Sequence, residues 1–185
     1  MKVCKDWGVL ISQTGSEVIA ISKETGFLPS LLITNNIRKM PLETLSSLIE
    51  LGVTVKEVPF RPTLEDYLIP ELLEKKLITL HGFLRILPPA FFKQYSGELY
   101  NGHPGLINFF PELKGKDPQI RAWERSYVTV GSVVHKVTEG VDEGEIVRYS
   151  ATPNTARSLD DMYNLLRGTS LDSWVRFFKN NWNFE

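Results

Sequence analysis

Three polar side chains in this sequence, an amide, an imidazole and a carboxylate, are of the types that can run acyl transfer to an amine. The amide and the imidazole are Asn101 and His103, and the carboxylate is Asp142 in a later Val-Asp-Glu-Gly-Glu segment. Transfer of a one-carbon acyl group between two nitrogens passes through a tetrahedral intermediate with a negatively charged oxygen. One amine loses a proton in this reaction and the other gains one. Such chemistry requires neither a nucleophilic side chain nor a metal.

Each residue type fits one part of this chemistry. Asn101 and a protonated imidazole can donate hydrogen bonds to the oxyanion, each preorganised donor being worth about 3 kcal/mol. His103 can hold or shuttle a proton near neutral pH. Asp142 can orient the imidazole ring, favour its charged form and pass protons through a bound water. Taken singly, the three also have ordinary interpretations as a loop histidine, a strand-end asparagine and a turn aspartate.

The histidines could also be considered as zinc ligands. The chain has three of them, His81, His103 and His135. Their spacings fit no compact ligand motif, and the single cysteine, Cys4, excludes a thiolate metal cluster and an internal disulfide. We therefore expect no metal.

The elements that must position these side chains follow from the hydrophobic pattern. Short apolar runs alternate with amphipathic stretches, which predicts an α/β fold with a parallel sheet and helices on both faces. The expected strands are 8–11, 31–34, 53–58 and 77–80, and the expected helices are 16–23, 41–51 and 63–76. The pattern then changes, and 127–137 and 145–150 are expected as neighbouring strands before a terminal helix at 158–182, interrupted near Gly168. In parallel sheets, ligands bind beyond the carboxyl ends of the strands.

Length and charge limit the kind of protein further. The 185 residues, 42% of them hydrophobic, predict one domain over 1–185. The formal net charge of -1, from 21 basic and 22 acidic side chains, argues for small-molecule partners and against nucleic acid or an anionic membrane. No apolar run approaches the roughly 20 residues that cross a bilayer. The first residues also lack the apolar region of a signal peptide, so we expect a cytoplasmic protein.

Three blocks of the sequence resemble the folate-dependent formyltransferases, most closely the single-domain type that acts on glycinamide ribonucleotide. Residues 82–91 resemble the family's strand end and following helix, and 101–106 resemble its Asn-x-His-Pro catalytic strand. Residues 131–144 resemble its final strand and the loop with the catalytic aspartate. The likeness extends from about Val9 to about Phe178. Three blocks in the right order are far more specific than any one of them.

The resemblance implies a three-layer, Rossmann-like, mostly parallel sheet whose strands in the C-terminal half are partly antiparallel. It also implies that Asn101, His103 and Asp142 are the catalytic residues. The one-carbon donor would be 10-formyltetrahydrofolate, without a metal, and a primary amine would attack it directly. The positions that correspond to the family's folate-binding segments are Leu84, Arg85, Leu87, Thr138 and Val141.

The acceptor side resembles the family less closely. Gly15 and Ser16 correspond to a loop whose backbone amides hold the acceptor's phosphate at a helix start. His135, on an alternating strand, either faces the acceptor or is a structural histidine. Glu17 in the first helical turn would repel a phosphate, although Ser16 and Glu17 could also be ordinary helix-start residues. Ser170 stands where the family has a carboxylate that binds the acceptor amine.

The segment 108–122 also departs from the family pattern and is longer. Because it follows the catalytic strand, we expect it to form one wall of the acceptor cleft. Lys114 and Lys116 in it could meet an anionic group, or they could simply be solvated.

The leading hypothesis is a formyltransferase that acts on glycinamide ribonucleotide, because longer family members that formylate initiator tRNA or nucleotide sugars usually carry a C-terminal extension. Formylation of another amine, such as an amino sugar, stays open because of Glu17 and Ser170. A hydrolase that releases formate from the same folate is a third interpretation, although the family's hydrolases usually carry an additional N-terminal domain. A non-catalytic folate or nucleotide binding module is the fourth. The protein is expected to be a monomer or a homodimer.

Overall fold

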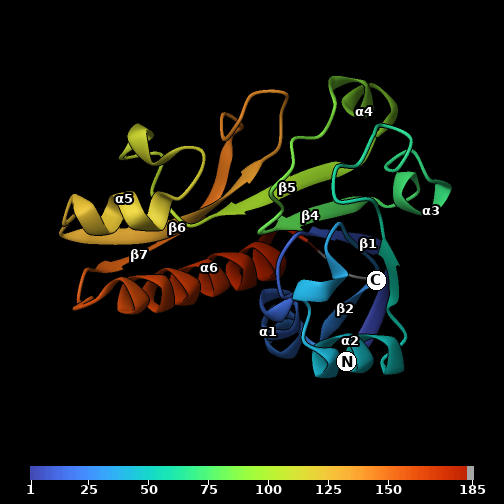
Figure 1. Ribbon diagram of the computed structural model, residues 1–185, viewed down its shortest axis with the longest axis horizontal. Helices are drawn as coiled ribbons and strands as arrows, with labels where there is room; N and C mark the ends of the chain where they lie inside the picture. Colours follow the sequence, from blue (N-terminus) through green and yellow to red (C-terminus); the bar gives the residue numbers. More distant parts are fainter. Residues whose placement is uncertain (183–185) are drawn as a thin grey trace. The chain divides into compact units, whose positions relative to one another are not determined.

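The computed structural model describes residues 1–182, and its strands form a seven-stranded sheet in the order β3-β2-β1-β4-β5-β6-β7 (Figure 1). The strands are β1 (Lys2–Ile11), β2 (Phe27–Thr34), β3 (Thr54–Glu57), β4 (Leu77–His81), β5 (Glu98–His103), β6 (Thr129–Lys136) and β7 (Ile146–Pro153). The helices are α1 (Ser16–Thr25), α2 (Leu42–Glu50), α3 (Pro70–Leu73), α4 (Pro89–Gln94), α5 (Pro118–Glu124) and α6 (Leu159–Asn181), with 3-10 turns η1 (Ile37–Lys39) and η2 (Pro111–Leu113). The expected α/β class is confirmed.

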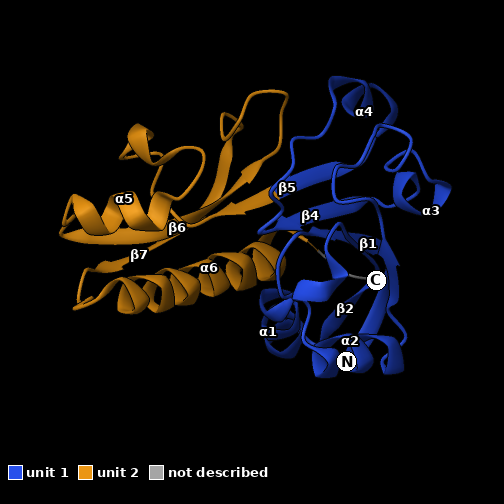
Figure 2. Ribbon diagram, viewed as in Figure 1, with its two compact units in different colours: residues 1–100, 184–185 blue, residues 101–183 orange. Residues whose placement is uncertain are grey.

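Met1–Tyr100 belong to one compact unit of the chain, and a second unit begins at Asn101 (Figure 2). In the first unit, β1 pairs in parallel with β2 and with β4, and β2 pairs in parallel with β3. The side chains of Val9, Leu10 and Ile11 are fully buried. A strand buried on both faces is typical of parallel sheets and explains its uninterrupted apolar run.

The second unit contains the antiparallel part of the sheet, where β6 pairs with β7. Helix α6 runs alongside these two strands (Figure 1). Two buried hydroxyls join helix and strand: Ser132 Oγ donates to Leu166 O at 3.0 Å, and Ser173 Oγ donates to Ser132 O at 3.2 Å. Because serine side chains are small, they let the helix approach the strand closely while their hydroxyls stay hydrogen-bonded.

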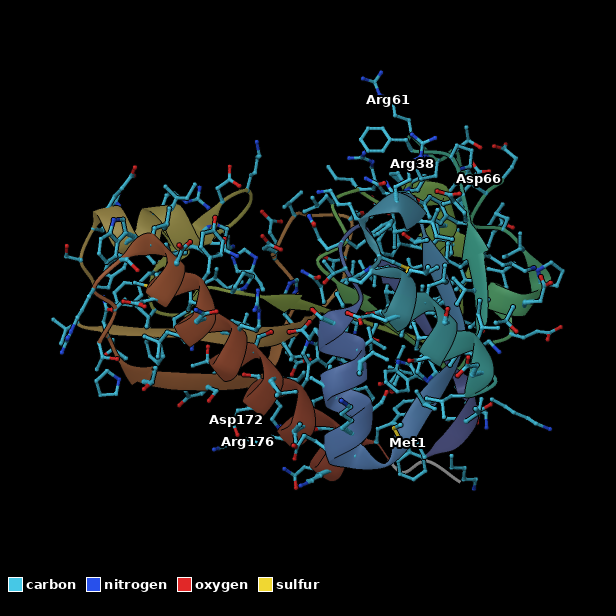
Figure 3. All side chains as sticks on the ribbon, turned by 60° about the horizontal axis from the view of Figure 1, so that its bottom comes forward. Met1, Arg38, Arg61, Asp66, Asp172 and Arg176 are labelled. Carbon is cyan, nitrogen blue, oxygen red and sulfur yellow. The ribbon has the colours of Figure 1, made fainter. Side chains whose placement is uncertain are left out.

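Helix α6 is continuous, so the expected interruption near Gly168 is wrong. A glycine costs a helix about 1 kcal/mol relative to alanine, but the turn that follows buries Trp174, Phe177 and Phe178 almost completely. Burial of three aromatic side chains outweighs that cost. On the outer surface of α6, Asp172 and Arg176 form an ion pair one turn apart at 2.9 Å (Figure 3).

The helix expected at 63–76 is also wrong, because only α3 forms in that segment. Asp66 accepts hydrogen bonds from the N–H and the hydroxyl of Thr63, at 2.6 and 3.1 Å, and the turn that these bonds close does not continue into a helix. Pro70 would remove a hydrogen bond and clash if it lay inside a longer helix, so it becomes the first residue of a short one. No helix within residues 1–182 is both long and apolar enough to cross a membrane.

Candidate active site

Strand β5 presents two of the predicted catalytic side chains on one face, because Asn101 and His103 alternate with Gly102 along it. Asp142 comes from the loop between β6 and β7, where its backbone is left-handed with φ 53°. Its Oδ2 lies 3.2 Å from Nδ1 of His103. All three residues belong to the second unit. The structure therefore brings together an imidazole and a carboxylate that are far apart in the sequence.

His135 joins Asn101 to this pair. Its Nε2 lies 3.2 Å from Nδ2 of Asn101 and 3.4 Å from Oδ1 of Asp142. Its Nδ1 lies 2.8 Å from the carbonyl oxygen of Lys136. A carbonyl can only accept, so Nδ1 carries a hydrogen. His135, which the sequence predicts as an acceptor contact or a structural histidine, thus touches both the amide and the carboxylate.

The two central groups of the site perturb each other's ionisation. Burial lowers the pKa of His103, and the nearby charge of Asp142 opposes that effect. Burial by itself would raise the pKa of Asp142, but a hydrogen bond with His135, the charge on His103 and the N–H of Gly115 together lower it. Asp142 is therefore a carboxylate near neutral pH, beside an imidazole whose protonation depends on it.

Packing requires a glycine at position 102 of the Asn-Gly-His-Pro-Gly segment and leaves little room for a side chain at Gly105. A Cβ on Gly102 would lie 2.5 Å from Nε1 of Trp174, and one on Gly105 would lie 3.2 Å from both Nε2 of His103 and Cβ of Leu113. Contacts below 3.0 Å cannot be accommodated without movement of the buried Trp174 ring. Gly102 therefore lets α6 support the catalytic strand, and Gly105 lets Leu113 approach His103.

Main-chain groups of the segment after β5 complete the site, and sequence reasoning missed them. His103 Nε2 donates to Leu113 O at 2.8 Å, and Gly115 N–H donates to Asp142 Oδ2 at 2.7 Å. The segment 108–122 does lie beside the predicted catalytic residues, but it also includes most of helix α5, which was not expected. Gly115, with φ 79°, was the available signal for a special backbone conformation. The side chain of Lys116 is 89% exposed.

The residues expected to bind folate lie in both units. In the first unit, Leu84 is exposed and Leu87 is buried, and the guanidinium of Arg85 lies over the ring of Phe60 at 4.3 Å. In the second unit, Val141 is half exposed, and Thr138 Oγ1 donates to Gly140 O at 3.3 Å. These placements do not test their role, which stays a prediction.

The loop expected to hold the acceptor's phosphate does lead into a helix, because Gly15 is left-handed with φ 73° and Ser16 begins α1. The Glu17 carboxylate lies 2.8 Å from Nδ1 of His81, a buried histidine. His81 Nε2 lies 2.9 Å from Oγ1 of Thr79, which also accepts from the indole of Trp7 at 2.8 Å. An ionised carboxylate can only accept, so Nδ1 of His81 carries a hydrogen that faces Glu17.

Two further expectations concern Ser170 and metal ligands. Ser170 is buried on α6. Within residues 1–182, no group of three histidine, cysteine, aspartate or glutamate side chains is suited to hold a metal ion.

The fold and the site define an α/β protein with a cluster of a half-buried amide, a buried imidazole and a half-buried carboxylate. Residues 62–170, more than half of the chain, match the model of the formyl transferase family. The chain belongs to this family, and the resemblance proposed from the three sequence blocks is confirmed.

Named relatives and a solved structure agree with the family. The trifunctional purine biosynthetic protein adenosine-3 of Gallus gallus is 32% identical over 156 residues, which cover 78% of this chain and 15% of the relative. Phosphoribosylglycinamide formyltransferase of Escherichia coli (strain K12) is 35% identical over 85 residues, or 46% of this chain and 39% of the relative. The crystal structure of phosphoribosylglycinamide formyltransferase from Anaplasma phagocytophilum is similar with a TM-score of 0.80 and 25% identity, covering 92% of this chain and 82% of that one. This chain thus spans well under half the length of both curated relatives.

Proposed function

We propose that this protein transfers a formyl group from 10-formyltetrahydrofolate to the primary amine of glycinamide ribonucleotide, a step of purine biosynthesis. The observation that carries the proposal is the contact between His103 and Asp142 at 3.2 Å, with Asn101 held beside them through His135. Membership of the formyl transferase family supports the donor. The names of the relatives, phosphoribosylglycinamide formyltransferase among them, support the acceptor.

In the proposed reaction the acceptor amine attacks the formyl carbon directly, and the C–N bond to the folate breaks after a tetrahedral intermediate. The amide N–H of Asn101 donates to the oxyanion of that intermediate. Its Nδ2 has two hydrogens, so a contact with His135 leaves one for the substrate. No covalent bond to the protein is formed.

His103 acts through Nδ1 in this proposal, because its Nε2 is hydrogen-bonded to the Leu113 carbonyl. When protonated, Nδ1 supports the oxyanion and supplies the proton that the leaving folate nitrogen gains. Asp142 favours that charged form and accepts, through a water molecule, the proton that the attacking amine loses. Proton loss and proton gain are thus both assigned to groups within one hydrogen-bonded cluster.

The Glu17–His81 pair weakens the main objection to a phosphorylated acceptor. A carboxylate aimed freely at the start of α1 would repel a phosphate. Here the Glu17 carboxylate lies against the Nδ1–H of His81, so part of its charge is already compensated by a donor.

The test follows the absorbance change as 10-formyltetrahydrofolate is converted to tetrahydrofolate, with and without glycinamide ribonucleotide, using His103→Ala as the blank. Strong dependence on the acceptor supports the proposal. Turnover without an acceptor would contradict formyl transfer and indicate hydrolysis of the folate. Turnover only with another amine, such as an amino sugar, would show that glycinamide ribonucleotide is not the acceptor. Folate binding that His103→Ala retains, with no turnover by the unaltered protein, would indicate a binding module.

A further inference from the structure

One short segment of main chain, Leu113 to Gly115, binds both members of the catalytic pair. The carbonyl of Leu113 accepts from Nε2 of His103, and the N–H of Gly115 donates to Oδ2 of Asp142. The first contact fixes which ring nitrogen of His103 carries a hydrogen in the neutral form. The second fixes the rotation of the carboxylate. The position of this segment therefore decides the geometry of the pair.

The segment is itself held by an arginine of helix α5. Arg121 Nη2 donates to Leu113 O at 3.2 Å and to Lys114 O at 2.8 Å. The side chain of Leu113 packs into the same buried cluster as Ala122, which follows Arg121. The guanidinium thus bonds two consecutive carbonyls, one of which is the acceptor for His103.

Arg121 is half-buried, and the burial of its Nε has a cost that calls for a compensating role. Its Nε is buried and has no hydrogen-bond partner among residues 1–182. Leaving a buried donor unbonded costs about 1–3 kcal/mol. An exposed conformation would avoid that cost, as Arg125 does one turn along the chain, where it pairs with Glu112 at 3.6 Å on the surface.

We propose that Arg121 is a positioning residue for the active site: by holding the carbonyls of Leu113 and Lys114, it keeps His103 in its Nε2–H tautomer and Asp142 in register with the ring. It acts through the main chain of the segment and does not touch the reacting atoms. The inference deepens the proposed formyl transfer, but its structural part holds for any reaction that uses His103 and Asp142.

The direction in which the pKa of His103 changes on removal of Arg121 distinguishes a positioning role from the effect of a nearby positive charge. Apart from burial, which lowers the pKa of His103, four groups act on it: Asp142 and the bond to Leu113 raise its pKa, whereas His135 and Arg121 lower it. The effect of the Leu113 bond exceeds that of the Arg121 charge. Removal of Arg121 therefore lowers the pKa of His103 if the Leu113 contact is lost with it, and raises the pKa if only the charge is lost.

The experiment compares Arg121→Met with Arg121→Lys and with Arg125→Met, a matched control at an exposed arginine directly after α5. Nitrogen-15 NMR of the histidine rings reports the tautomer and the pKa of His103 without any substrate. We expect Arg121→Met to give a mixture of tautomers and a lower pKa, Arg121→Lys to restore the Nε2–H form in part, and Arg125→Met to match the unaltered protein. A retained Nε2–H tautomer, with an unchanged or raised pKa, would overturn the proposal.

Kinetics supply the second readout. We expect kcat of Arg121→Met to fall about tenfold with each KM within about twofold, because the interaction is needed to orient reacting groups and not to bind substrate. An altered KM at unchanged kcat would also overturn the positioning role.

If the unaltered protein shows no formyl transfer, the NMR result still decides the inference, so the two failures are distinguishable. If Arg121→Met does not fold, as judged by circular dichroism, the tautomer in Arg121→Lys decides: a fully retained Nε2–H form overturns the inference, and a mixture supports it.

Discussion

Replacement of Asp142 by asparagine removes a charge from the centre of the site while keeping the size of the side chain. The carboxylate oxygen lies 3.2 Å from Nδ1 of His103, and the Asp142 side chain is only 10% exposed. At an effective dielectric constant of about 20, two unit charges at that distance attract by about 5 kcal/mol. Partial solvation and relaxation reduce the part of this attraction that stabilises the transition state. We take that part as about 2–4 kcal/mol, so its removal should lower kcat by about 30- to 1,000-fold.

The assay is the steady-state rate of 10-formyltetrahydrofolate conversion with glycinamide ribonucleotide, measured over a range of pH. Asp142 raises the pKa of His103 against the burial that lowers it. Without the carboxylate that pKa falls further, so the protonated form is lost at lower pH than in the unaltered protein. The decline of the rate towards alkaline pH should move to lower pH in Asp142→Asn.

Glu143→Gln is the matched control, because Glu143 is the adjacent carboxylate and is exposed. We expect its rate and its pH profile to stay close to those of the unaltered protein. The reasoning would be refuted if Asp142→Asn kept kcat within about fivefold, or if its alkaline limb stayed in place.

Three further predictions rest on single contacts. Asn101→Ala should lower kcat about 100-fold with little change in the melting temperature, since it removes one oxyanion donor; equal kcat values would exclude that role. Gly102→Ala should lower the free energy of unfolding by about 1–3 kcal/mol in urea titrations, because its Cβ would meet Trp174 at 2.5 Å; an unchanged midpoint would contradict the packing. Ser158→Ala should cost about 1 kcal/mol, since Ser158 Oγ caps α6 by accepting from Asp161 N–H at 3.1 Å, and thermal unfolding against Ser158→Asn, which keeps a cap, measures it.

Strands β1, β2 and β4 could be predicted because their apolar runs are buried on both faces. The apolar run 8–11 marks the C-terminal end of β1, although the strand begins at Lys2, where its side chains are more exposed. Residues 63–76 could not be predicted by the same reasoning. Their helical pattern conflicts with the constraint at Pro70, which starts a new short helix, and tertiary context decides between such alternatives.

The side chains of the site could be predicted better than its main-chain contacts. Asn101, His103 and Asp142 are recognisable because their chemistry is specific to residue type. Leu113 and Gly115 contribute a carbonyl and an N–H, groups that almost every residue carries, so nothing in their identity marks them. Only the path of the chain places these groups against the imidazole and the carboxylate.

The two ring nitrogens of His103 contact groups of different charge. The imidazole of His103 has two nitrogens, and the acceptor that holds Nε2 is a backbone carbonyl with no charge to lose at any pH. The tautomer is therefore fixed independently of the titration of Asp142, which acts on the opposite nitrogen. Were a second carboxylate in the place of Leu113 O, the ring would be drawn towards a permanently charged state, and it would release its proton less readily. In the proposed formyl transfer between two amines, His103 must both take up and release a proton, and a neutral orienting group on one side with a charged one on the other would allow both.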